Sequence, residues 1–412
     1  MKTVGIIAEY NPFHFGHAWQ IAQAKALSGA DFAVIAMSPD FVQRGTPPLT
    51  DKWSRARAAL TAGADLVLEL PVRAAVGSAE YFAQGGVSLL GALGAVDALS
   101  FGCEAEDPGI LSDAAHFFAA EEPPQYQEKL REGLRAGMTY PGARTAAYLS
   151  CTETSDRTAG EESRIRETLS QPNNILAIEY LRACQMLGIA MDTVPVARRG
   201  AGYHDPSAEQ KYSSASAIRS ALEQGRDVRS FMPPEAGRIL EHEIGQGRFV
   251  TGEDMSLLLH ARLMDLTRGN NTEKALNNLS SCLDVGEDLA ARIRNMLCEY
   301  QGYEQFTALL KTRQITETRV RRALIHILLG LKKDSDRRIR YARVLGFRRD
   351  AGELLRGIRE RTSVPLITKL ADAPDFPGLE EDLEASCLWE MLAAHKTEKK
   401  MRSEYRRQLQ IL

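Results

Sequence analysis

Two histidines near the start of the chain, His14 and His17, have the type and spacing for phosphoryl chemistry. Residues 1–7 predict a short buried strand, Asn11-Pro12 breaks it, and apolar residues over 17–27 then recur at helical spacing. A helix N-terminus offers unpaired N–H groups and a positive dipole end, both of which suit a phosphate. Imidazoles placed there can donate hydrogen bonds to charge that develops during phosphoryl transfer.

The run from His14 to His17 resembles the HxGH signature of the nucleotidyltransferase superfamily. Members of that superfamily bind ATP over an open α/β sheet and catalyse attack on its α-phosphorus without a covalent enzyme intermediate. Gly16, between the histidines, would let the backbone approach a ligand closely. The alternatives are a helix-capping pair or a metal site. We expect no metal, because no carboxylate or third His lies near enough in the sequence to complete a ligand shell.

Length and composition set the class of protein. With 412 residues, 44% of them hydrophobic, the chain can hold two or three domains. It has no run of eighteen apolar residues and no pattern of a signal peptide, so we expect no membrane span. Its six cysteines are scattered without a CxxC pair, which is typical of reduced cysteines in a cytoplasmic protein.

The first half of the sequence alternates between buried strands and helices. Strands are predicted over 31–37, 65–70 and 97–101, with helices over 51–62 and 80–93 between them. This alternation predicts a doubly wound parallel sheet, in which ligands bind beyond the carboxyl ends of the strands. The loops expected at that edge are 8–17, 38–50, 71–79 and 102–106.

Several later segments carry candidate binding residues. Loop 38–50, with Arg44 and then Lys52, is expected to contact substrate or to be an exposed connection. Gly102 follows a strand and would let a flat ring lie against the backbone, although a glycine there is equally a turn former. Residues 107–170 are predicted to be helical. Asn174 could cap the helix that Pro172 begins, or could reach a ribose or phosphate.

Two more stretches favour an anionic ligand. Arg198 and Arg199 follow a strand predicted over 191–197. Ser214 precedes an apolar helix that has Arg219 in its first turns, and this stretch resembles the second motif of the same superfamily, which holds the β- and γ-phosphates. A Ser-capped surface helix is the alternative for this stretch.

The sequence changes character after Pro233-Pro234. Helical periodicity runs through 253–268, 287–300, 303–311, 316–332 and 380–411. Between 311 and 370, seventeen Lys and Arg stand against six Asp and Glu, a net charge of +11 in a chain whose total is −3. Such asymmetry favours a nucleic-acid surface, on which Tyr341 and Phe347 could stack on bases. The alternative is a solvated basic face with both aromatics in the core.

Together these features resemble one family, the bacterial tRNA(Met) cytidine acetate ligases. The resemblance covers nearly the whole chain and rests on the motifs at 9–17, 43–45, 101–104, 172–181, 199–205, 214–219 and 343–347. In that family, ATP converts acetate to acetyl-adenylate with loss of pyrophosphate. The N4 amine of the wobble cytidine of elongator tRNA(Met) then attacks the acetyl group and expels AMP.

The resemblance implies a fold and a set of site residues. It implies a doubly wound, Rossmann-like α/β catalytic domain over 1–232, with a helical insertion at about 107–170, followed by an all-α, tRNA-binding domain over 233–412. It implies His14, His17 and Arg219 as catalytic residues. ATP, expected to arrive with Mg²⁺, would contact Ile7, Ala8, Glu9, Tyr10, Asn11, Pro12, Phe13, His14, Phe15, Gly16, His17, Ala18, Trp19, Gln20, Gly102, Asn174, Arg199 and Ser214. From the charge of the basic segment, and not from the resemblance, we expect the tRNA to contact Arg337, Arg338, Arg340, Arg343, Arg348 and Arg349.

The chain departs from the family at two positions. Phe15 stands where the family commonly has Asn, and Cys103 where Ser is common. Two other functions remain open: a small-molecule adenylyltransferase with the same HxGH motif, and a non-catalytic RNA-binding protein. The basic helical half argues against the first, and the intact His14, His17 and Arg219 argue against the second.

Overall fold

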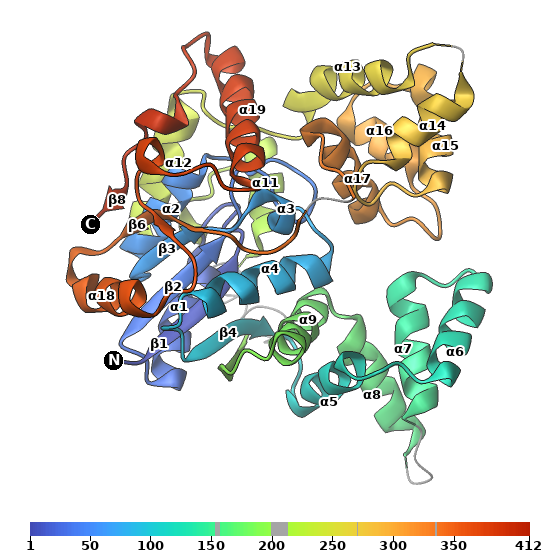
Figure 1. The fold of residues 1–412 in the computed structure, drawn as a ribbon, viewed down its shortest axis with the longest axis horizontal. Coiled ribbons are helices and arrows are strands. Elements are labelled where there is room, and N and C mark those ends of the chain that lie inside the picture. Colours follow the sequence, from blue (N-terminus) through green and yellow to red (C-terminus); the bar gives the residue numbers. More distant parts are fainter. Residues whose placement is uncertain (153–156, 199–212, 270, 334–335) are drawn as a thin grey trace.

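The chain forms a mostly parallel β-sheet with helices on both faces (Figure 1). The structure, a computed structural model, describes residues 1–152, 157–198, 213–269, 271–333 and 336–412. The strands are β1 (Thr3–Ala8), β2 (Phe32–Met37), β3 (Leu66–Glu69), β4 (Ala98–Cys103), β5 (Asp192–Ala197), β6 (Ala342–Phe347), β7 (Leu366–Ile367) and β8 (Gln410–Ile411). Among the described residues they lie in the order β5-β4-β1-β2-β3-β6-β7, with β8 beside β6. Strands β1 to β5 are parallel, as predicted.

Alternate residues of the strands bury against different helices. The core helices are α1 (Phe15–Ser28), α2 (Lys52–Thr61), α3 (Val72–Ala75), α4 (Ala79–Ala92), α9 (Pro172–Leu187), α11 (Ala215–Glu223) and α12 (Pro234–Gly245). Ile6 joins a core with α1, α2, α11 and α12, whereas Ile7 joins a core with α4 and α9. Two-sided burial explains why these strands appear in the sequence as continuous apolar runs. Because β1 and β4 are neighbours, the chain reverses its winding between them, and their carboxyl ends mark the expected ligand site.

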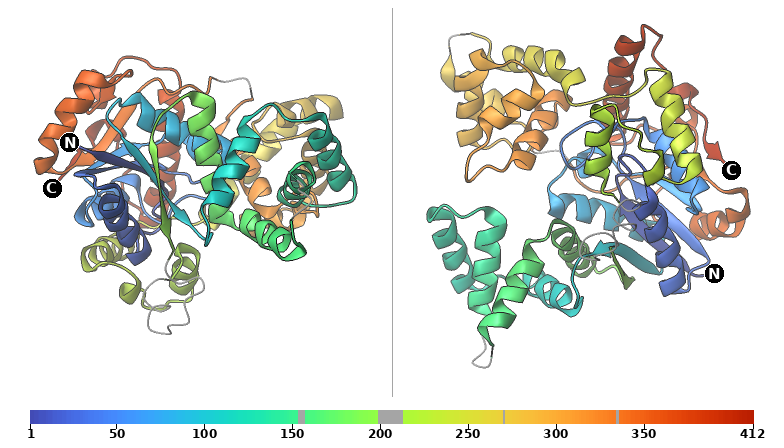
Figure 2. Two further views of the ribbon diagram at one scale, coloured as in Figure 1. Left: turned by 90° about the horizontal axis from the view of Figure 1, so that it is seen from below. Right: turned by 180° about the vertical axis from the view of Figure 1, so that it is seen from behind.

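Two groups of helices project from the same side of this core (Figures 1 and 2). The insertion lobe contains α5 (Gly109–Ala119), α6 (Pro124–Arg135), α7 (Tyr140–Cys151) and α8 (Ala159–Ser170), which confirms that the described part of 107–170 is mostly helical. The C-terminal lobe contains α13 (Ser256–Thr267), α14 (Thr272–Ser280), α15 (Glu287–Met296), α16 (Tyr303–Leu310) and α17 (Glu317–Leu329). In the part of the chain described here, no helix is long and apolar enough to cross a membrane.

The C-terminal lobe clamps the loop that follows β2. Gly45 has a positive φ of 78°, and a Cβ there would lie 2.5 Å from the backbone carbon of Arg321. The Tyr303 hydroxyl donates to the Gly45 carbonyl. His326, buried in the lobe, makes a ring-nitrogen contact of 2.8 Å with the Val76 carbonyl. The Gly45 contacts hold loop 38–50, with Arg44, against the lobe, and the His326 contact holds the end of α3.

Residues 342–411 correct the prediction that the C-terminal half is all helical. Strand β6 pairs antiparallel with β3, and after α18 (Gly352–Arg361) and α19 (Leu379–Thr397) the chain returns as β8 beside β6. The helix predicted over 380–411 therefore ends at Thr397. Helix α12 lies beyond residue 232 yet packs on the α/β core through Ala236 and Leu240. The division of the chain at 232 stays a prediction.

The charge of Arg343 is the reason that strand β6 was not predicted. The predicted contact of Arg343 with tRNA is wrong. Its charge interrupts an apolar run, but the side chain is only 3% exposed and lies 2.9 Å from Glu69. The Lys52 ammonium, fully buried, lies 2.7 Å from the same carboxylate and 3.1 Å from Asp40. Glu404 contacts both cations. Arg343 therefore cannot contact tRNA, and Lys52 belongs to the core and not to a substrate loop.

Because the ion-pair cluster is buried, we expect the loss of one of its cations to lower the stability of the fold strongly. Replacing Arg343 with Met should lower the free energy of unfolding by about 3–5 kcal/mol, because the buried Glu69 and Glu404 would keep only Lys52, which also pairs with Asp40. Arg348→Met is the matched control, since the half-exposed Arg348 pairs with Asp350 at the surface and should contribute less than about 1 kcal/mol. Urea unfolding measures both. Equal stability of the two variants would contradict the assignment.

Candidate active site

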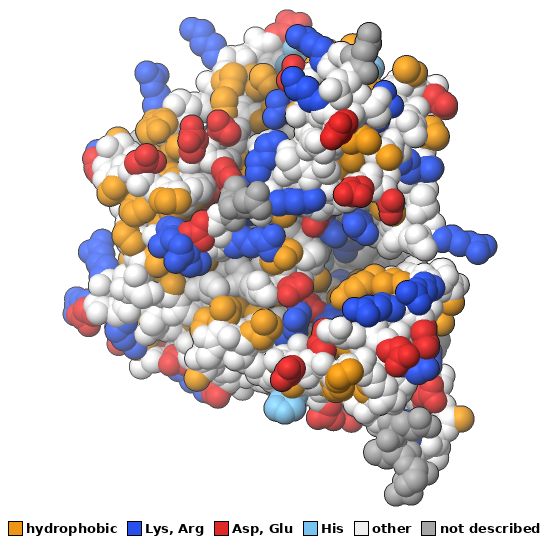
Figure 3. All heavy atoms as spheres, turned by 45° about the vertical axis from the view of Figure 1, so that its right-hand side comes forward, with side chains coloured by type: hydrophobic (Ala, Val, Ile, Leu, Met, Phe, Trp, Pro, Cys, Tyr) orange, Lys and Arg blue, Asp and Glu red, His pale blue; other side chains and the backbone are white. Residues whose placement is uncertain are grey.

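A cavity of about 570 Å³ lies at the carboxyl ends of β1 and β4, the position that the sheet topology indicates. Its volume is in the range of small-molecule sites. It is lined by Ile7, Ala8, Glu9, Tyr10, Asn11, His14, Gly16, His17, Trp19, Gln20, Gln43, Arg44, Phe82, Phe101, Gly102, Glu104, Pro172, Asn173, Leu176, Tyr180, Val196, Ala197, Arg198, Ser213, Ser214, Ala215, Ser216 and Arg219. Figure 3 shows a hollow on the face that carries both lobes, bordered by Lys and Arg side chains.

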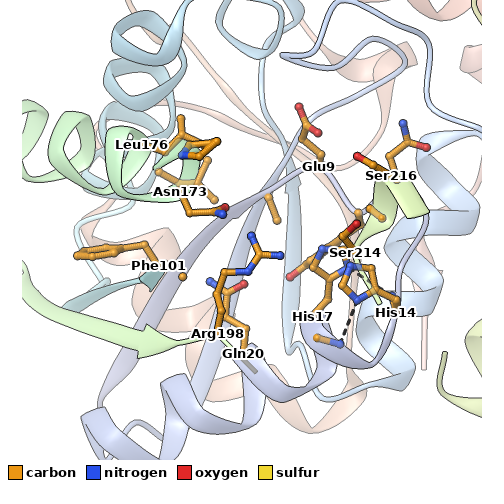
Figure 4. Close-up of a pocket in the computed structure, with 18 of the residues that line it drawn as sticks. Glu9, His14, His17, Gln20, Phe101, Asn173, Leu176, Arg198, Ser214 and Ser216 are labelled. Atoms are coloured by element: carbon orange, nitrogen blue, oxygen red, sulfur yellow. Dashed lines mark hydrogen bonds between the residues drawn. The ribbon is translucent and has the colours of Figure 1, made fainter. Parts of the chain in front are cut away.

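His14 and His17 lie at the N-terminus of α1 with their rings 3.7 Å apart (Figure 4). The Gly16 N–H donates to Nδ1 of His14 at 3.0 Å, and the His14 N–H donates to Nδ1 of His17 at 3.3 Å. Because each Nδ1 accepts, the ring proton of each neutral imidazole lies on Nε2. Each histidine thus keeps one N–H donor that the backbone does not use. The capping alternative and the phosphate site are compatible, since capping sets the direction of the donor.

Gly16 has a steric role that the sequence did not reveal. A Cβ at this position would lie 2.8 Å from Cε1 of His14. The absence of a side chain therefore makes room for the imidazole that caps the helix, besides exposing backbone to the cavity.

Burial keeps both imidazoles neutral. It lowers the pKa of His14 to about 3, and the nearby Arg198 guanidinium acts in the same direction. It also lowers the pKa of His17 well below the usual value, assisted by His14 and Arg198. The histidines therefore act as neutral hydrogen-bond donors at physiological pH, and the positive charge of the site comes from arginines.

A second helix N-terminus faces the same cavity. Ser214 caps α11 by accepting from the Ala217 N–H at 3.2 Å, and Ser213 to Ser216 line the cavity. Arg219, one turn into α11, donates from Nη1 to the Asn11 carbonyl at 2.7 Å. The structure therefore brings His14, His17, Ser214 and Arg219 together, although some 200 residues separate the two motifs. Two helix N-termini with a guanidinium between them suit a polyphosphate.

The opposite side of the cavity is flatter and more apolar. Phe101 and Leu176 lie there, apart from the histidines (Figure 4), and Gly102 exposes backbone beside them. A Cβ placed on Gly102 would make only ordinary van der Waals contact, with the Arg198 side chain at 3.7 Å and beyond. This surface suits a planar nucleobase, and the contact of Gly102 with one stays a prediction.

Asn174 does not have the predicted contact with a ligand. Its side chain is fully buried, accepts from the Glu104 N–H at 2.9 Å and donates to the Thr168 carbonyl at 3.0 Å. Its neighbour Asn173 lines the cavity instead. The buried amide holds the loop after β4, so Asn174 is a positioning residue. Of the other predicted ATP contacts, Pro12, Phe13, Phe15 and Ala18 do not line the cavity, and Arg199 lies outside the described residues.

The cavity contains residues that the sequence analysis did not select as ligand contacts. They are Gln43, Phe82, Phe101, Glu104, Pro172, Asn173, Leu176, Tyr180, Val196, Ala197, Ser213, Ala215 and Ser216, whereas Arg44 and Arg198 were expected near a ligand. Most of them flank a predicted residue by one or two positions or sit at the end of a predicted strand. Strand ends could have indicated Phe101, Glu104, Val196 and Ala197, whereas most of the others lie in helices that meet the cavity only in the folded chain.

The remaining predicted tRNA contacts lie at the surface. Arg337, Arg338 and Arg349 are exposed, and Arg340 and Arg348 are half-exposed. The Arg337 guanidinium stacks over the Tyr81 ring at 3.7 Å. Asp336 lies 3.0 Å from Arg338 and 2.6 Å from Arg340. Arg337, Arg338 and Arg340 precede β6 and Arg348 and Arg349 follow its other end, so the five arginines flank the two ends of that strand; together we call them the basic surface.

The two aromatics of this region do not serve as a stacking platform. Tyr341 is only 2% exposed, and its hydroxyl donates to Asp382 at 2.6 Å. Phe347 is half-buried against the main core. The structure therefore favours the alternative, in which both rings belong to the protein interior.

Comparison with known proteins decides which chemistry these features serve. Residues 1–404 match the HIGH Nucleotidyl Transferase family. The tRNA(Met) cytidine acetate ligase of Acetivibrio thermocellus is 37% identical over 385 residues, which cover 90% of this chain and 89% of that protein. The ligase of Clostridium perfringens is 33% identical over 399 residues, covering 95% and 96%. This chain belongs to the tRNA(Met) cytidine acetate ligase family of HIGH nucleotidyltransferases.

A solved member of the family supports the interpretation of the cavity. The crystal structure of Thermotoga maritima TmcAL bound with alpha-thio ATP superposes with a TM-score of 0.86 at 29% sequence identity and covers 100% of both chains. The apo form of the same protein gives a TM-score of 0.88. The fold predicted from the HxGH motif and the alternating strands is thus confirmed, apart from the C-terminal strands.

The histidine geometry predicts a specific loss of phosphoryl chemistry. His17→Ala should slow adenylate formation by roughly 100-fold or more, on the scale of losing one preorganised donor. Acetate-dependent exchange of pyrophosphate into ATP measures this step. A folded variant that exchanges at the wild-type rate would show that His17 plays no part in it.

The depressed pKa values predict the pH response. A histidine whose pKa lies below its usual value is already neutral at pH 6, so raising the pH to about 8 removes no proton from it. The exchange rate should therefore not fall over that interval. A fall centred near the ordinary histidine pKa would mean that a protonated imidazole is required.

Proposed function

We propose that this chain is an ATP-dependent tRNA(Met) cytidine acetate ligase. It joins acetate to the N4 amine of the wobble cytidine of elongator tRNA(Met), with release of AMP and pyrophosphate. The observation that carries the proposal is the convergence of both nucleotidyltransferase motifs on one cavity, in a chain that matches named ligases over nine-tenths of its length.

The first step activates acetate. Phe101, Gly102 and Leu176 hold the adenine, and the N-termini of α1 and α11 hold the triphosphate. An acetate oxygen attacks the α-phosphorus, and pyrophosphate leaves. The Nε2–H donors of His14 and His17 stabilise the charge that grows on the phosphoryl oxygens, and Arg219 holds the leaving pyrophosphate. These groups need no reorganisation during the reaction, because backbone contacts fix them.

Mg²⁺ is expected to arrive bound to the triphosphate. Among the described residues, no group of three His, Cys, Asp or Glu side chains is arranged to hold a metal ion. This fits the usual binding of Mg²⁺ through substrate phosphates and water, because the ion gives up water reluctantly and seldom occupies an all-protein cage. When bound, it would neutralise part of the phosphate charge.

The second step transfers the acetyl group to RNA. The exocyclic amine of cytosine is conjugated with its ring and is a weak nucleophile, and acetate itself has no good leaving group. The mixed anhydride supplies AMP as the leaving group. A nucleotide of the anticodon loop can be turned into the cavity at small unstacking cost.

The tRNA is the natural occupant of the positive surface outside the cavity. We propose that the five arginines of the basic surface contact its phosphates, and that the enzyme acts in the cytoplasm. Phosphate contacts set position and affinity without reading bases, so the choice of cytidine belongs to the cavity.

One assay tests the proposed function. Labelled acetate, ATP and bulk bacterial tRNA are incubated with the protein, and the tRNA is digested to nucleosides. We expect label in N4-acetylcytidine and in no other nucleoside. Label that enters a small adenylated product instead would support the adenylyltransferase alternative, and the absence of any ATP-dependent product would support a non-catalytic role.

The basic surface makes a separate prediction. Arg337→Glu and Arg338→Glu should weaken tRNA binding and make the log–log salt dependence shallower by about one per lost contact. Both variants should keep the wild-type melting temperature and the rate of pyrophosphate exchange. A lower melting temperature with an unchanged salt slope would assign these arginines to folding.

A further inference from the structure

Glu9 carries a carboxylate that the phosphate chemistry does not use. It follows β1 directly and lines the cavity. The backbone N–H of Gln43 donates to the carboxylate. Its Oε1 is shielded from solvent, and no donor in the described part of the chain reaches it. A buried acceptor without a partner is costly, so such an atom indicates a ligand contact.

Two of the three cations near Glu9 donate their hydrogen bonds to other acceptors. Arg219 donates to the Asn11 carbonyl and to Ser216, and Arg55 donates to the carbonyls of Glu9, Ser38, Pro39 and Thr50. Arg44 is exposed at the cavity. None of the three forms an ion pair within 4.0 Å of the Glu9 carboxylate among the described residues. Glu9 is therefore not a simple structural counter-ion.

The groups around Glu9 come from several elements. Arg44 from the loop after β2, Arg55 from α2 and Arg219 from α11 favour its ionised form, whereas Tyr180 from α9 also faces it. Burial outweighs the three cations and raises the pKa of Glu9 above its usual value. A carboxylate with a raised pKa is a stronger base than an exposed one.

The position of Glu9 separates it from the apolar surface that suits the nucleobase. Figure 4 shows its carboxylate on the side of Ser216, away from Phe101, Asn173 and Leu176. Gln43 and Arg44, from the loop that the C-terminal lobe clamps, border this side. Ser216 lies in the first turn of α11, so Glu9 lies on the phosphate side of the cavity, where its unpaired oxygen can accept from an amine once pyrophosphate has left.

We propose that Glu9 is the catalytic base that accepts the proton of the cytidine N4 amine during acetyl transfer. The amine nitrogen forms a bond to the acetyl carbon, and the bond from that carbon to the AMP oxygen breaks. AMP leaves with the electron pair, and one N4 proton passes to Glu9 Oε1 and then to solvent. This inference rests on the proposed ligase function and assigns the second half-reaction to a named residue.

The test compares the two half-reactions in a Glu9→Gln variant. The amide keeps the size of the side chain and an acceptor for Gln43, but it cannot take a proton. Acetate-dependent pyrophosphate exchange should stay within a fewfold of wild type. Single-turnover transfer from preformed acetyl-adenylate to tRNA should fall by about 10²–10⁴-fold, the usual contribution of general base catalysis.

The pH profile distinguishes a base from a structural group. The wild-type transfer rate should rise with pH and level off once Glu9 is ionised, whereas the Glu9→Gln rate should lose that step. Glu9→Asp should recover part of the transfer rate. The exposed Glu128→Gln on α6 serves as the control and should match wild type in both half-reactions.

Each outcome bears on one claim. Wild-type transfer by Glu9→Gln would overturn the assignment of Glu9 and leave the ligase function standing. Loss of exchange and transfer together, with an unchanged melting temperature, would place Glu9 in the ATP site and also overturn it. Absence of acetate-dependent exchange in the wild-type protein would instead overturn the proposed function.

Discussion

The Lys52 ammonium is the constraint on which much of the architecture depends. It is fully buried at the start of α2, where an unpaired charge would be strongly destabilising. Asp40 and Glu69 supply carboxylates from neighbouring loops and strands, and Glu404 comes from the end of the chain. Three carboxylates in turn need a second cation, which Arg343 provides from β6. Arg343 and Glu404 both come from the C-terminal segment, so the buried ion pairs of this cluster form only when that segment returns to the sheet.

The buried ion-pair cluster is connected to the cavity through the loop after β2. Asp40 accepts from the Lys52 N–H and from Ser386 of α19, and Arg55 binds the carbonyls of Glu9 and Ser38. The C-terminal lobe holds the same loop at Gly45. Residues on the Glu9 side of the cavity, which come early in the sequence, are thus held in place by contacts with segments that come late in it. A change in the C-terminal half can therefore alter catalysis without touching a substrate.

Local patterns in the sequence predicted the parts of the fold that local forces determine. Buried runs gave β1 to β5, and the HxGH and Ser214-to-Arg219 motifs located both helix N-termini of the site. Arg343 and Tyr341 were misassigned because their partners, Glu69 and Asp382, are distant in the sequence. A basic side chain in a basic segment gives no sign that it is buried. The predicted ligand contact of Asn174 was wrong for the same reason, since its side-chain oxygen accepts a hydrogen bond from Glu104 in the loop after β4.

The central claim is that this cavity couples acetate to ATP through the α-phosphorus. The most direct measurement uses acetate labelled with oxygen-18, with ATP and tRNA, followed by mass spectrometry of the nucleotide products. Attack of acetate on the α-phosphorus predicts one labelled oxygen in AMP for each acetylated cytidine and none in inorganic phosphate. Label in inorganic phosphate with ADP as the product would show that acetate is activated at the terminal phosphate, and would contradict the account.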